Sequence, residues 1–548
     1  MAVKLFGFAI SILLVASASA SAPVAAHPTG APEIAAVSTL SEITAADRTG
    51  TSLDPAWHHG AFMEIFVRSY RDTDGDGIGD LRGVTASLDY LQRLGVRGIW
   101  LMPVTRSQDG DHGYAVADYR QIEPAYGTLA DFDELLAQAH ARGIGVIIDY
   151  VINHSAATHP AFVAASGAVD SPYRDWYMML PTAPAGWNIF GKDPWVPMAT
   201  GVYLAQFSPT MPDFNMRNPD ALEYHKRNLR YWLDRGVDGF RFDAVVHLIE
   251  NGPNAWRDQP ENRALMQQLR AVVDAYPNRY IVCEAASNAI AYAADTACGS
   301  AFALEQARDI VAAAGGSRSA IRAVAAQMDQ AAAMAGMVSN HDLFAGERLW
   351  DQVDGDAARY RLAAATYLLQ PGTPFIYYGE EVGMSAAAGL QGDPKLRTPM
   401  SWRPDATTAG FSSVKPYRVP SANVLRNNAQ TQATSEDSLL AYYAALLALR
   451  NDFLSIARGM VDEVSVTNRT LGYRRHIGDE QVWVFINYAK RPERVGLRAS
   501  HLHALRQIFP QRPLTSPVAD GNGQLTVLVP AQSTLVFATQ PAGAGTAE

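Results

Sequence analysis

Eight short apolar runs alternate with helical segments along this 548-residue chain, and this alternation restricts its fold more than any other feature. The segments between the runs, such as 130–142 and 221–235, carry apolar residues at helical spacing. Successive βα units predict a parallel sheet, and eight units predict a closed (β/α)8 TIM barrel, an α/β fold. An open doubly wound sheet is the alternative, but no GxGxxG motif follows the first run. The runs cover residues 62–67, 95–104, 143–151, 237–243, 279–285, 299–304, 335–340 and 373–379.

Two segments interrupt the βα alternation. Residues 154–211, after the third predicted strand, are rich in Pro, Trp, Tyr and Gly. Such an insertion lies on the catalytic face of a barrel, so we expect a small insertion domain there. After residue 450 the sequences LGYRRHI, QVWVFINYA and QLTVLVP are typical of antiparallel strands, which predicts a C-terminal β-sandwich. The expected division is a barrel over 56–153 and 212–450, a sandwich over 451–540 and a tail over 541–548.

The N-terminal segment is typical of a signal peptide. Lys4 supplies a positive charge, residues 5–15 are apolar, and small residues at 18–22 provide two A-x-A cleavage sites. The apolar run is short for a membrane span. We expect a signal peptide over 1–22 and a loose leader over 23–55. The mature protein would be exported, periplasmic or secreted, and free of the membrane.

Charge and cysteine content limit the partners and the environment. The net charge is -10 and no basic cluster is present, so nucleic acid is not an expected partner. The two cysteines, Cys283 and Cys298, could form a disulfide in an exported protein. Alternatively, Cys283 lies in the apolar run YIVCEA and could be a small core residue. The sequence leaves both options open.

Polar residues stand at the carboxyl ends of several predicted strands. The chemistry of a parallel barrel takes place at that end. Asp243, Glu284 and Asp342 would therefore meet there from three different strands. Carboxyl groups in such a set can cleave a glycosidic bond. The four motifs concerned are DYVINHS (149–155), GFRFDAVVH (239–247), IVCEAA (281–286) and MVSNHD (337–342).

These motifs, in this order, resemble those of the α-amylase family, glycoside hydrolase family 13. The resemblance extends over nearly all of residues 60–540 and includes HGYAVADY (112–119), MPDFN (211–215) and PGTPFIYYGEE (371–381). RTPMSW (397–402) and DTDGDGIGD (72–80) resemble the oligo-1,6-glucosidase and intermediate branches. The resemblance implies a retaining enzyme that cleaves α-1,4-glucosidic bonds of starch-type glucans and maltooligosaccharides.

The resemblance also implies a role for each acid. Asp243 would be the nucleophile, and Glu284 the general acid and then the general base, with a raised pKa. Their carboxyl groups would lie about 5–5.5 Å apart, as in retaining enzymes. Asp342 would hold sugar hydroxyls and favour a distorted ring. Arg241 shares a strand face with Asp243 by alternation and would favour the ionised carboxylate.

Further substrate-binding residues are implied in the same way. His341 and His154 would hydrogen-bond the same sugar, and Tyr114 would give it an aromatic face with His112 nearby. His247 either lines the site or is a packed histidine at the start of a helix. The sequence from Asp243 to His247 departs from the DxxKH pattern of many α-amylases, because the lysine that binds sugar on the reducing side is replaced by Val246. A valine donates no hydrogen bond, which favours short maltooligosaccharides or another glucoside over long starch chains.

An acidic loop predicts a structural Ca²⁺ site. DTDGDGIGD alternates Asp with Gly, which lets hard oxygen ligands converge on one ion. It begins like an EF-hand loop, but the twelfth position is Gly83 and the loop follows a strand. A solvated acidic turn is the alternative. The resemblance implies these ligands: Asp72, Asp74, Asp76, Asp80 and the carbonyl of Ile78.

Two other functions compete with α-amylase-like hydrolysis. An exo-acting α-glucosidase or a transglycosylase, using maltose, isomaltose or sucrose, would need the same acids, and loop shape would decide between them. A non-catalytic carbohydrate-binding protein with a hydrolase fold is the other alternative, but such proteins usually lose catalytic acids, and here all three are present. The expected partner is an α-glucan or oligosaccharide substrate, and the expected state is a monomer.

Overall fold

The computed structural model describes residues 52–498, 505–511, 518–519 and 524–539. The predicted signal peptide over 1–22, the tail over 541–548 and most of the leader over 23–55 lie outside these residues. Residues 52–55 are the described part of the leader. Leu53 is buried in a cluster with Trp57 and Phe62, and its carbonyl accepts a hydrogen bond from Asn278 Nδ2 at 3.2 Å.

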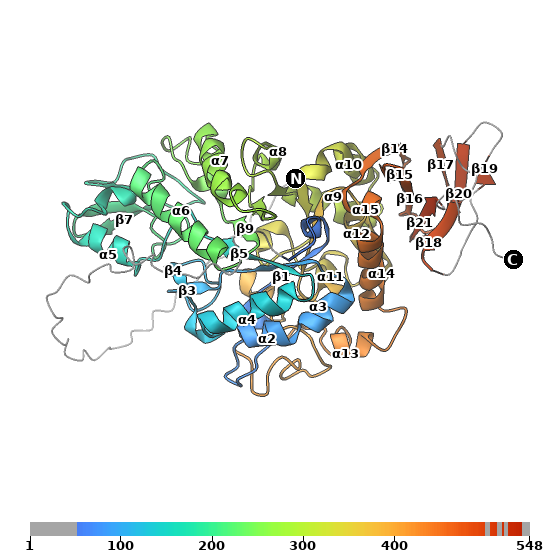
Figure 1. Cartoon of the computed structure of the whole chain (residues 1–548), viewed down its shortest axis with the longest axis horizontal. Helices are drawn as coiled ribbons and strands as arrows, with labels where there is room; N and C mark the ends of the chain where they lie inside the picture. Colours follow the sequence, from blue (N-terminus) through green and yellow to red (C-terminus); the bar gives the residue numbers. More distant parts are fainter. Residues whose placement is uncertain (1–51, 499–504, 512–517, 520–523, 540–548) are drawn as a thin grey trace, which may run out of the picture. The chain divides into compact units, whose positions relative to one another are not determined.

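Within the described residues, eight parallel strands close into a barrel, which confirms the predicted TIM barrel (Figure 1). They follow one another around the barrel in chain order, and β13 pairs back to β1 with Phe62 opposite Phe375. Trp100, Ile147 and Val282 are buried with these rings inside the barrel. The strands are β1 Phe62–Ile65, β2 Gly98–Leu101, β5 Gly145–Tyr150, β9 Gly239–Phe242, β10 Tyr280–Cys283, β11 Ala301–Phe302, β12 Met334–Gly336 and β13 Thr373–Tyr377.

Helices surround the strands, and local signals set their starts. Thr128 and Asp131 form a capping box at the start of α4, and Asn218 caps α6 ahead of Pro219. The longer helices are α3 Leu88–Leu94, α4 Leu129–His140, α6 Pro219–Asp234, α7 Pro260–Asp274, α9 Leu304–Ala314, α10 Arg318–Gln327, α12 Ala357–Leu368 and α14 Leu439–Asp452. The shorter helices are α1 Val67–Tyr70, α2 Leu81–Ala86, α8 Ala289–Ala293, α11 Leu349–Gln352, α13 Ala429–Gln432 and α15 Leu454–Arg458.

Two excursions follow the carboxyl ends of β2 and β5. After β2, the strands β3 Thr105–Ser107 and β4 Val116–Ile122 form an antiparallel pair. After β5, the insertion contains α5 Pro160–Gly167 and a three-stranded sheet in the order β6-β8-β7. Its strands are β6 Met179–Leu180, β7 Trp195–Met198 and β8 Gly201–Leu204. Both excursions therefore border the end of the barrel where chemistry is expected.

The C-terminal part is an antiparallel sandwich, as predicted. One sheet has the order β14-β15-β16-β21-β18 and the other β17-β20-β19. Trp483 and Phe537 of the first sheet pack against Val495 and Val527 of the second. The strands are β14 Met460–Val466, β15 Thr470–Ile477, β16 Glu480–Asn487, β17 Glu493–Arg498, β18 Leu505–Phe509, β19 Val518–Ala519, β20 Gln524–Val529 and β21 Ser533–Thr539.

A buried arginine joins the sandwich to the barrel. Arg475 of β15 donates to the carbonyl of Leu369, just after α12, at 3.1 Å. It also donates to the carbonyl of Gly459, just before β14, at 2.8 Å. The sandwich is thus tied to the barrel by charge-assisted hydrogen bonds as well as by apolar contacts.

The two cysteines form a disulfide, which settles the alternative that the sequence left open. Cys283, the last residue of β10, is bonded to Cys298, with 6.2 Å between their Cα atoms. The bridge ties the segment that precedes β11 back to the end of β10. None of the helices in the described part of the chain combines the length and the apolar character that crossing a membrane requires.

Candidate active site

Arg241 is the centre of a buried group of acids at the carboxyl ends of β5, β9 and β10. Its Nη1 donates to Asp243 Oδ1 at 2.6 Å and to Asp149 Oδ1 at 2.9 Å. Its Nη2 lies 2.9 Å from Glu284 Oε1, as an ion pair without the alignment of a hydrogen bond. The guanidinium carbon lies 5.1 Å from the centre of the Trp100 ring. One cation is therefore shared by three carboxyl groups.

Strand register explains this convergence. Asp149 of β5 and Val282 of β10 lie opposite Arg241 in the two neighbouring strands. Side chains two residues apart on a strand share a face, so Glu284 points to the same side as Val282, and Asp243 to the same side as Arg241. The structure thus brings Asp243 and Glu284 together beside Arg241.

Glu284 has the protonation behaviour expected of a general acid. Burial, together with the nearby charges of Asp243 and Asp342, raises its pKa to about 7, although Arg241 opposes the shift. The backbone N–H of Ala244 donates to Glu284 Oε2 at 3.1 Å. Ala244 adopts a φ of 50°, a left-handed conformation that is uncommon for a residue with a Cβ. This strained turn aims the N–H at the carboxyl group.

Asp342 is held in the opposite protonation state. Burial would raise its pKa, but His341 and Arg397 hold the pKa of Asp342 well below its usual range. Arg397 Nη2 lies 2.6 Å from Asp342 Oδ1, and His341 Nε2 lies 3.1 Å from Oδ2. His341 Nδ1 lies 2.6 Å from Glu64 Oε1. Burial would lower the pKa of His341, but the two carboxylates raise it to about 10, so the imidazole is a cation at neutral pH.

Tyr114 links the two groups of charges. Its hydroxyl donates to Asp149 Oδ2 at 3.0 Å and lies 2.7 Å from His341 Nε2. Its ring is stacked on that of His341, with 5.5 Å between centroids. Two histidines hold the Tyr114 backbone: His112 Nδ1 accepts from its N–H at 3.0 Å, and His154 Nε2 lies 3.2 Å from its carbonyl. Burial lowers the pKa of His154 to about 4, so it is neutral.

His247 stands beside this group and not within it. Its Nδ1 lies 3.0 Å from Gln206 Oε1, and its ring is stacked on that of Trp256. It makes no hydrogen bond or ion pair with Asp243, Glu284 or Asp342 among the contacts of the described residues. His247 is therefore a buried residue that packs against Gln206 and Trp256 next to the candidate active site.

Three residues of the site escaped the sequence analysis: Asp149, Glu64 and Arg397. Asp149 opens the DYVINHS motif, and burial raises its pKa to about 7. Glu64 is a single acid inside the apolar run of β1, and Arg397 opens RTPMSW. A charged residue within a buried strand was an available signal for the two acids. Arg397 gave no such signal, because its loop reaches the site only in the folded chain.

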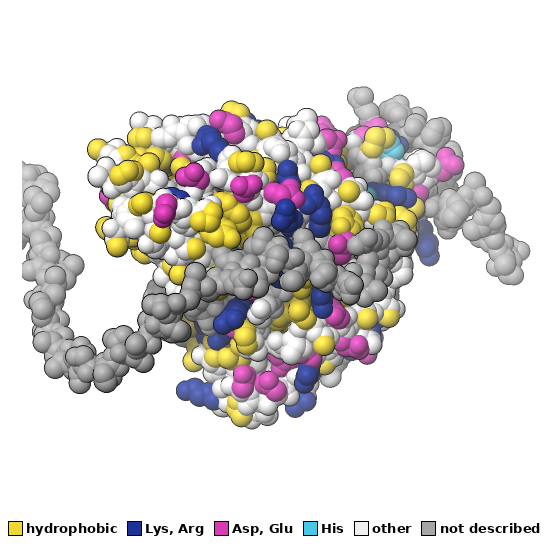
Figure 2. All heavy atoms as spheres, turned by 60° about the vertical axis from the view of Figure 1, so that its left-hand side comes forward, with side chains coloured by type: hydrophobic (Ala, Val, Ile, Leu, Met, Phe, Trp, Pro, Cys, Tyr) yellow, Lys and Arg dark blue, Asp and Glu magenta, His cyan; other side chains and the backbone are white. Residues whose placement is uncertain are grey.

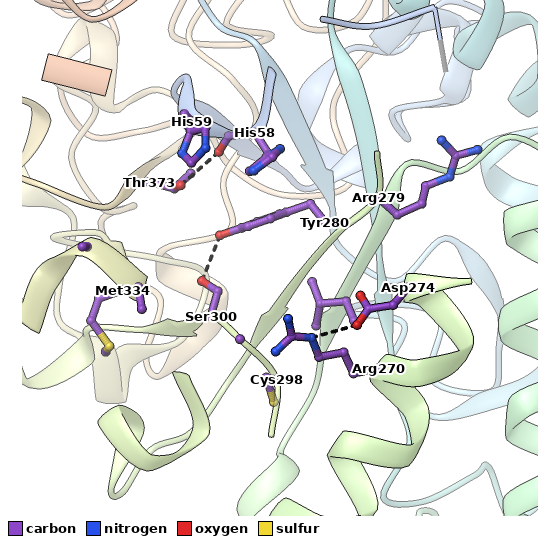
Figure 3. Close-up of a pocket in the computed structure, with 14 residues that line it drawn as sticks. His58, His59, Arg270, Asp274, Arg279, Tyr280, Cys298, Ser300, Met334 and Thr373 are labelled. Atoms are coloured by element: carbon purple, nitrogen blue, oxygen red, sulfur yellow. Dashed lines mark hydrogen bonds and ion pairs between the residues drawn. The ribbon is translucent and has the colours of Figure 1, made fainter. Parts of the chain in front are cut away.

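The cavity in Figure 3 lies at the other end of the barrel. It has a volume of about 230 Å³ and is lined by the first residues of β10 and β13, Tyr280 and Thr373. Tyr280 and Ser300 share a hydrogen bond of 3.0 Å across it. The amino ends of barrel strands serve stability, not chemistry, so this cavity is not the candidate active site.

The acidic loop brings three carboxylate groups close together. Carboxylate oxygens of Asp72, Asp74 and Asp80 lie within 4.8 Å of one another, which fits a hard cation such as Ca²⁺. Asp76, also expected as a ligand, is not part of this group, and its carboxylate accepts the N–H of Ile78 at 2.7 Å. Gly77 has a φ of 89°, and a Cβ there would meet the Lys415 carbonyl at 2.7 Å, so the loop needs glycine.

The closed barrel and its buried acids define the class of (β/α)8-barrel glycoside hydrolases. Comparison with known proteins identifies the family within this class. Residues 64–459 match the model of the α-amylase catalytic domain. Alpha-amylase 3 of Dictyoglomus thermophilum is 31% identical over 79% of this chain and 85% of its own length. The trehalose synthase/amylase of Mycolicibacterium smegmatis is 33% identical over 78% and 82%. The crystal structure of an α-amylase from H. orenii covers 88% of this chain and 100% of its own, at 32% identity and a TM-score of 0.77.

The chain belongs to the α-amylase family of glycoside hydrolases. The resemblance seen in the sequence is thereby confirmed.

Proposed function

We propose that the protein is a retaining hydrolase of α-1,4-glucosidic bonds in starch-type glucans and maltooligosaccharides. The observation that carries the proposal is the contact of Arg241 with both Asp243 and Glu284, combined with the raised pKa of Glu284. A carboxyl group that keeps its proton near neutral pH, beside one paired with arginine, provides the acid and the nucleophile that retaining hydrolysis requires.

The chemistry would proceed in two displacements. The Asp243 carboxylate attacks the anomeric carbon while the bond to the glycosidic oxygen breaks, and Glu284 gives its proton to that oxygen. Water then attacks the glycosyl ester, Glu284 takes a proton from the water, and Asp243 is released. Asp342, held ionised by His341 and Arg397, would accept hydrogen bonds from the sugar hydroxyls.

A product profile tests this proposal. Purified protein would be incubated with soluble starch, maltoheptaose, maltose, isomaltose and sucrose, with Asp243→Asn as the control. Rapid shortening of starch and α-configured new reducing ends are expected from the wild type, with none from the variant. Turnover by Asp243→Asn equal to that of the wild type would refute the assignment of the nucleophile.

The second candidate is an exo-acting α-glucosidase or a transglycosylase. It is favoured by Val246, a buried aliphatic residue on the segment that follows the proposed nucleophile. Because this segment has no side-chain hydrogen-bond donor at this point, it should bind a long glucan more weakly. Glucose released singly from maltose or isomaltose, with starch hardly shortened, would select this candidate.

We also propose that Asp72, Asp74 and Asp80 bind a structural Ca²⁺. Their donor set supports this, and the site is separate from the proposed catalytic acids. Chelation should lower the unfolding temperature, and added Ca²⁺ should restore it. Asp74→Ala should abolish this response while Asp76→Ala, outside the group, should retain it. An equal response from the wild type and Asp74→Ala would contradict the site.

Export is proposed on the basis of the N-terminal segment and is supported by the disulfide. A Cys283–Cys298 bridge persists in oxidising compartments and is rare in the cytosol. Fractionation of cells expressing the full chain should recover the activity outside the cytoplasm. Recovery of the full-length, reduced protein in the cytoplasm would contradict the proposal.

A further inference from the structure

Arg348 is a buried arginine that lies outside the charge network of the candidate active site. On the face shown in Figure 2, Lys and Arg side chains lie at the surface, where water solvates their charge. Arg348, which directly precedes α11, is only 2% exposed. Within the described part of the chain it makes no ion pair, and its hydrogen bonds all go to backbone carbonyls. Because burying a charge is costly unless hydrogen bonds compensate it, these carbonyls indicate what Arg348 does.

The carbonyls that Arg348 contacts belong to two segments of the chain. Its Nε and Nη2 donate to the Leu396 carbonyl at 3.0 and 2.6 Å. Its Nη1 donates to the carbonyl of Tyr378, the residue after β13, at 2.9 Å. The guanidinium carbon also lies 4.5 Å from the centre of the Tyr377 ring, at the end of β13. Arg348 therefore connects the loop that contains Leu396 to the carboxyl end of a barrel strand.

Leu396 directly precedes Arg397, which forms an ion pair with Asp342. The Leu396 carbonyl belongs to the planar peptide group from which Arg397 continues. The Tyr377 hydroxyl also donates to this carbonyl, at 3.2 Å. A carbonyl oxygen has two lone pairs, so donors from Arg348 and Tyr377 saturate it. These two side chains therefore set the orientation of the peptide group before Arg397.

The backbone of Arg397 is held on both sides. Its own carbonyl accepts a hydrogen bond from Ser69 Oγ at 2.8 Å, which fixes the chain after Arg397. Arg348 fixes the chain before it. From this backbone the side chain reaches the His341 carbonyl through Nε at 2.9 Å and Asp342 Oδ1 through Nη2 at 2.6 Å. Contacts this short require the supporting backbone to be placed within about 0.5 Å.

Other contacts between the same two segments are more exposed. Lys395 forms an ion pair with Glu347, and both side chains are partly exposed. The N–H of Leu343 donates to Asp393 Oδ1 at 2.8 Å, and the Asp393 side chain is 43% exposed. Exposed ion pairs contribute little to stability. Arg348 is therefore the buried anchor between these segments.

A second buried arginine provides a contrast at the other end of the barrel. Arg450 is 1% exposed, and its hydrogen bonds within the described residues also go to backbone carbonyls. Those carbonyls include His59, before β1, and Leu368, before β13. The amino ends of barrel strands serve stability, not chemistry. Arg450 is thus chemically similar to Arg348 but is remote from the carboxyl ends of the strands.

We propose that Arg348 is a positioning residue for the candidate active site. It fixes the peptide group before Arg397 to the end of β13, so that the Arg397 guanidinium meets Asp342. Among the contacts of the described residues it makes none with Asp243, Glu284 or Asp342, so it acts through Arg397. This inference rests on the proposed hydrolase function, in which the Asp342 carboxylate binds sugar hydroxyls.

Kinetics of matched arginine variants test the inference. Arg348→Met keeps an unbranched side chain but removes every donor. We would measure kcat and KM for maltoheptaose and 4-nitrophenyl α-glucoside in the wild type, Arg348→Met and Arg450→Met. A displaced Arg397 should lower kcat in Arg348→Met by up to about 100-fold with little change in KM, because Asp342 is expected to act on the distorted sugar of the transition state. Arg450→Met should keep kcat within about twofold of the wild type, even where both variants lose stability.

A double variant shows whether Arg348 acts through Arg397. Arg348→Met/Arg397→Met should be no less active than Arg397→Met alone, because the second change removes what the first displaces. Losses that multiply would mean that the two residues act independently, and would overturn the inference. Arg348→Lys keeps the charge but not the planar fork, so it should recover only part of kcat.

Unchanged kcat in Arg348→Met, or an equal fall in Arg450→Met, would overturn the inference and leave the proposed function intact. If Arg348→Met does not fold, Arg348→Lys takes its place, and wild-type kcat in that variant would overturn the inference. Wild-type protein that cleaves neither substrate would overturn the proposed function, and the inference with it.

Discussion

Glu284 is buried and Asp342 is partly buried, and their pKa values move in opposite directions. Glu284 shares its one cation, Arg241, with two other acids, so burial prevails and its pKa rises to about 7. Asp342 is partly exposed and contacts two cations, His341 and Arg397, and these cations lower its pKa. At the residue scale, the number of cations per carboxylate separates a proton donor from a group that stays ionised.

The pH dependence of activity follows from Glu284. The enzyme needs the protonated acid, so kcat/KM should fall as the pH rises through about 7. Glu284→Gln should lower kcat/KM by about 10²–10⁴ and remove this alkaline limb. Initial rates with an aryl α-glucoside between pH 5 and 9 would measure both. If the limb remained in Glu284→Gln, it would belong to Asp149, whose pKa burial also raises to about 7.

Glu64 is expected to control stability through His341. Its carboxylate helps raise the pKa of His341 from 6.5 to about 10. A raised folded-state pKa stabilises the protein fully below the unfolded value, and this stabilisation is lost as the pH rises through about 10. Glu64→Gln should therefore be least stable relative to the wild type below pH 6.5, with the difference shrinking toward pH 10. Urea unfolding at several pH values would test this; a gap independent of pH would exclude the linkage.

Sequence reasoning singled out Asp243, Glu284 and Asp342, but it missed Asp149 and Glu64, which lie within barrel strands, and Arg397, which lies on a loop. Asp243, Glu284 and Asp342 could be placed because strand alternation and the polarity of a parallel barrel fix where they point. Arg397 could not, because nothing local brings its loop to Asp342. Distance along the chain carries no information about such a contact.

At the scale of elements, the end of β10 combines a disulfide with a residue of the candidate active site. The strand ends at Cys283, and the next residue is Glu284, so the disulfide and the proposed general acid are adjacent. The strands themselves were predictable from apolar runs, including the two-residue β11. The cysteine pairing was not, because it depends on how the chain returns to the end of β10 before β11.

Removing the disulfide should destabilise the fold. It closes a loop with a sequence separation of 15, for which chain entropy predicts about 3 kcal/mol of stabilisation. The double variant Cys283→Ser/Cys298→Ser should lose roughly that amount of unfolding free energy. Chemical denaturation would measure it, with reduced wild-type protein as the matched comparison. An unchanged free energy in both samples would show that the bridge is dispensable.

At the scale of the whole molecule, the barrel and the sandwich were both predictable, because period-2 alternation after residue 450 differs from the βα pattern before it. The attachment of the sandwich to the barrel was not predictable from the sequence. It depends on Arg475, which directly follows Arg474 in the sequence LGYRRHI. Nothing in the sequence distinguishes the roles of these two arginines. Only the folded chain shows that Arg475 is buried and Arg474 is partly exposed.

Arg475→Met should weaken this attachment strongly. It leaves the carbonyls of Leu369 and Gly459 without their donor, at about 1–3 kcal/mol each. Arg474→Met removes a partly exposed ion pair with Asp462, which is worth about 0–1 kcal/mol. Unfolding in urea and proteolysis between the barrel and the sandwich would compare the two variants. Equal losses of stability would contradict the assigned role of Arg475.

Three acids share the single cation Arg241, and this excess of acids also affects which small molecules can inhibit the protein. Asp149, Asp243 and Glu284 share this single guanidinium, so the carboxylates around it outnumber the cation. A small protonated amine is drawn to such a place, and more strongly as Glu284 and Asp149 lose their protons above neutral pH. Amine buffers and basic sugar mimics should therefore act as competitive inhibitors, most potent in mildly alkaline solution.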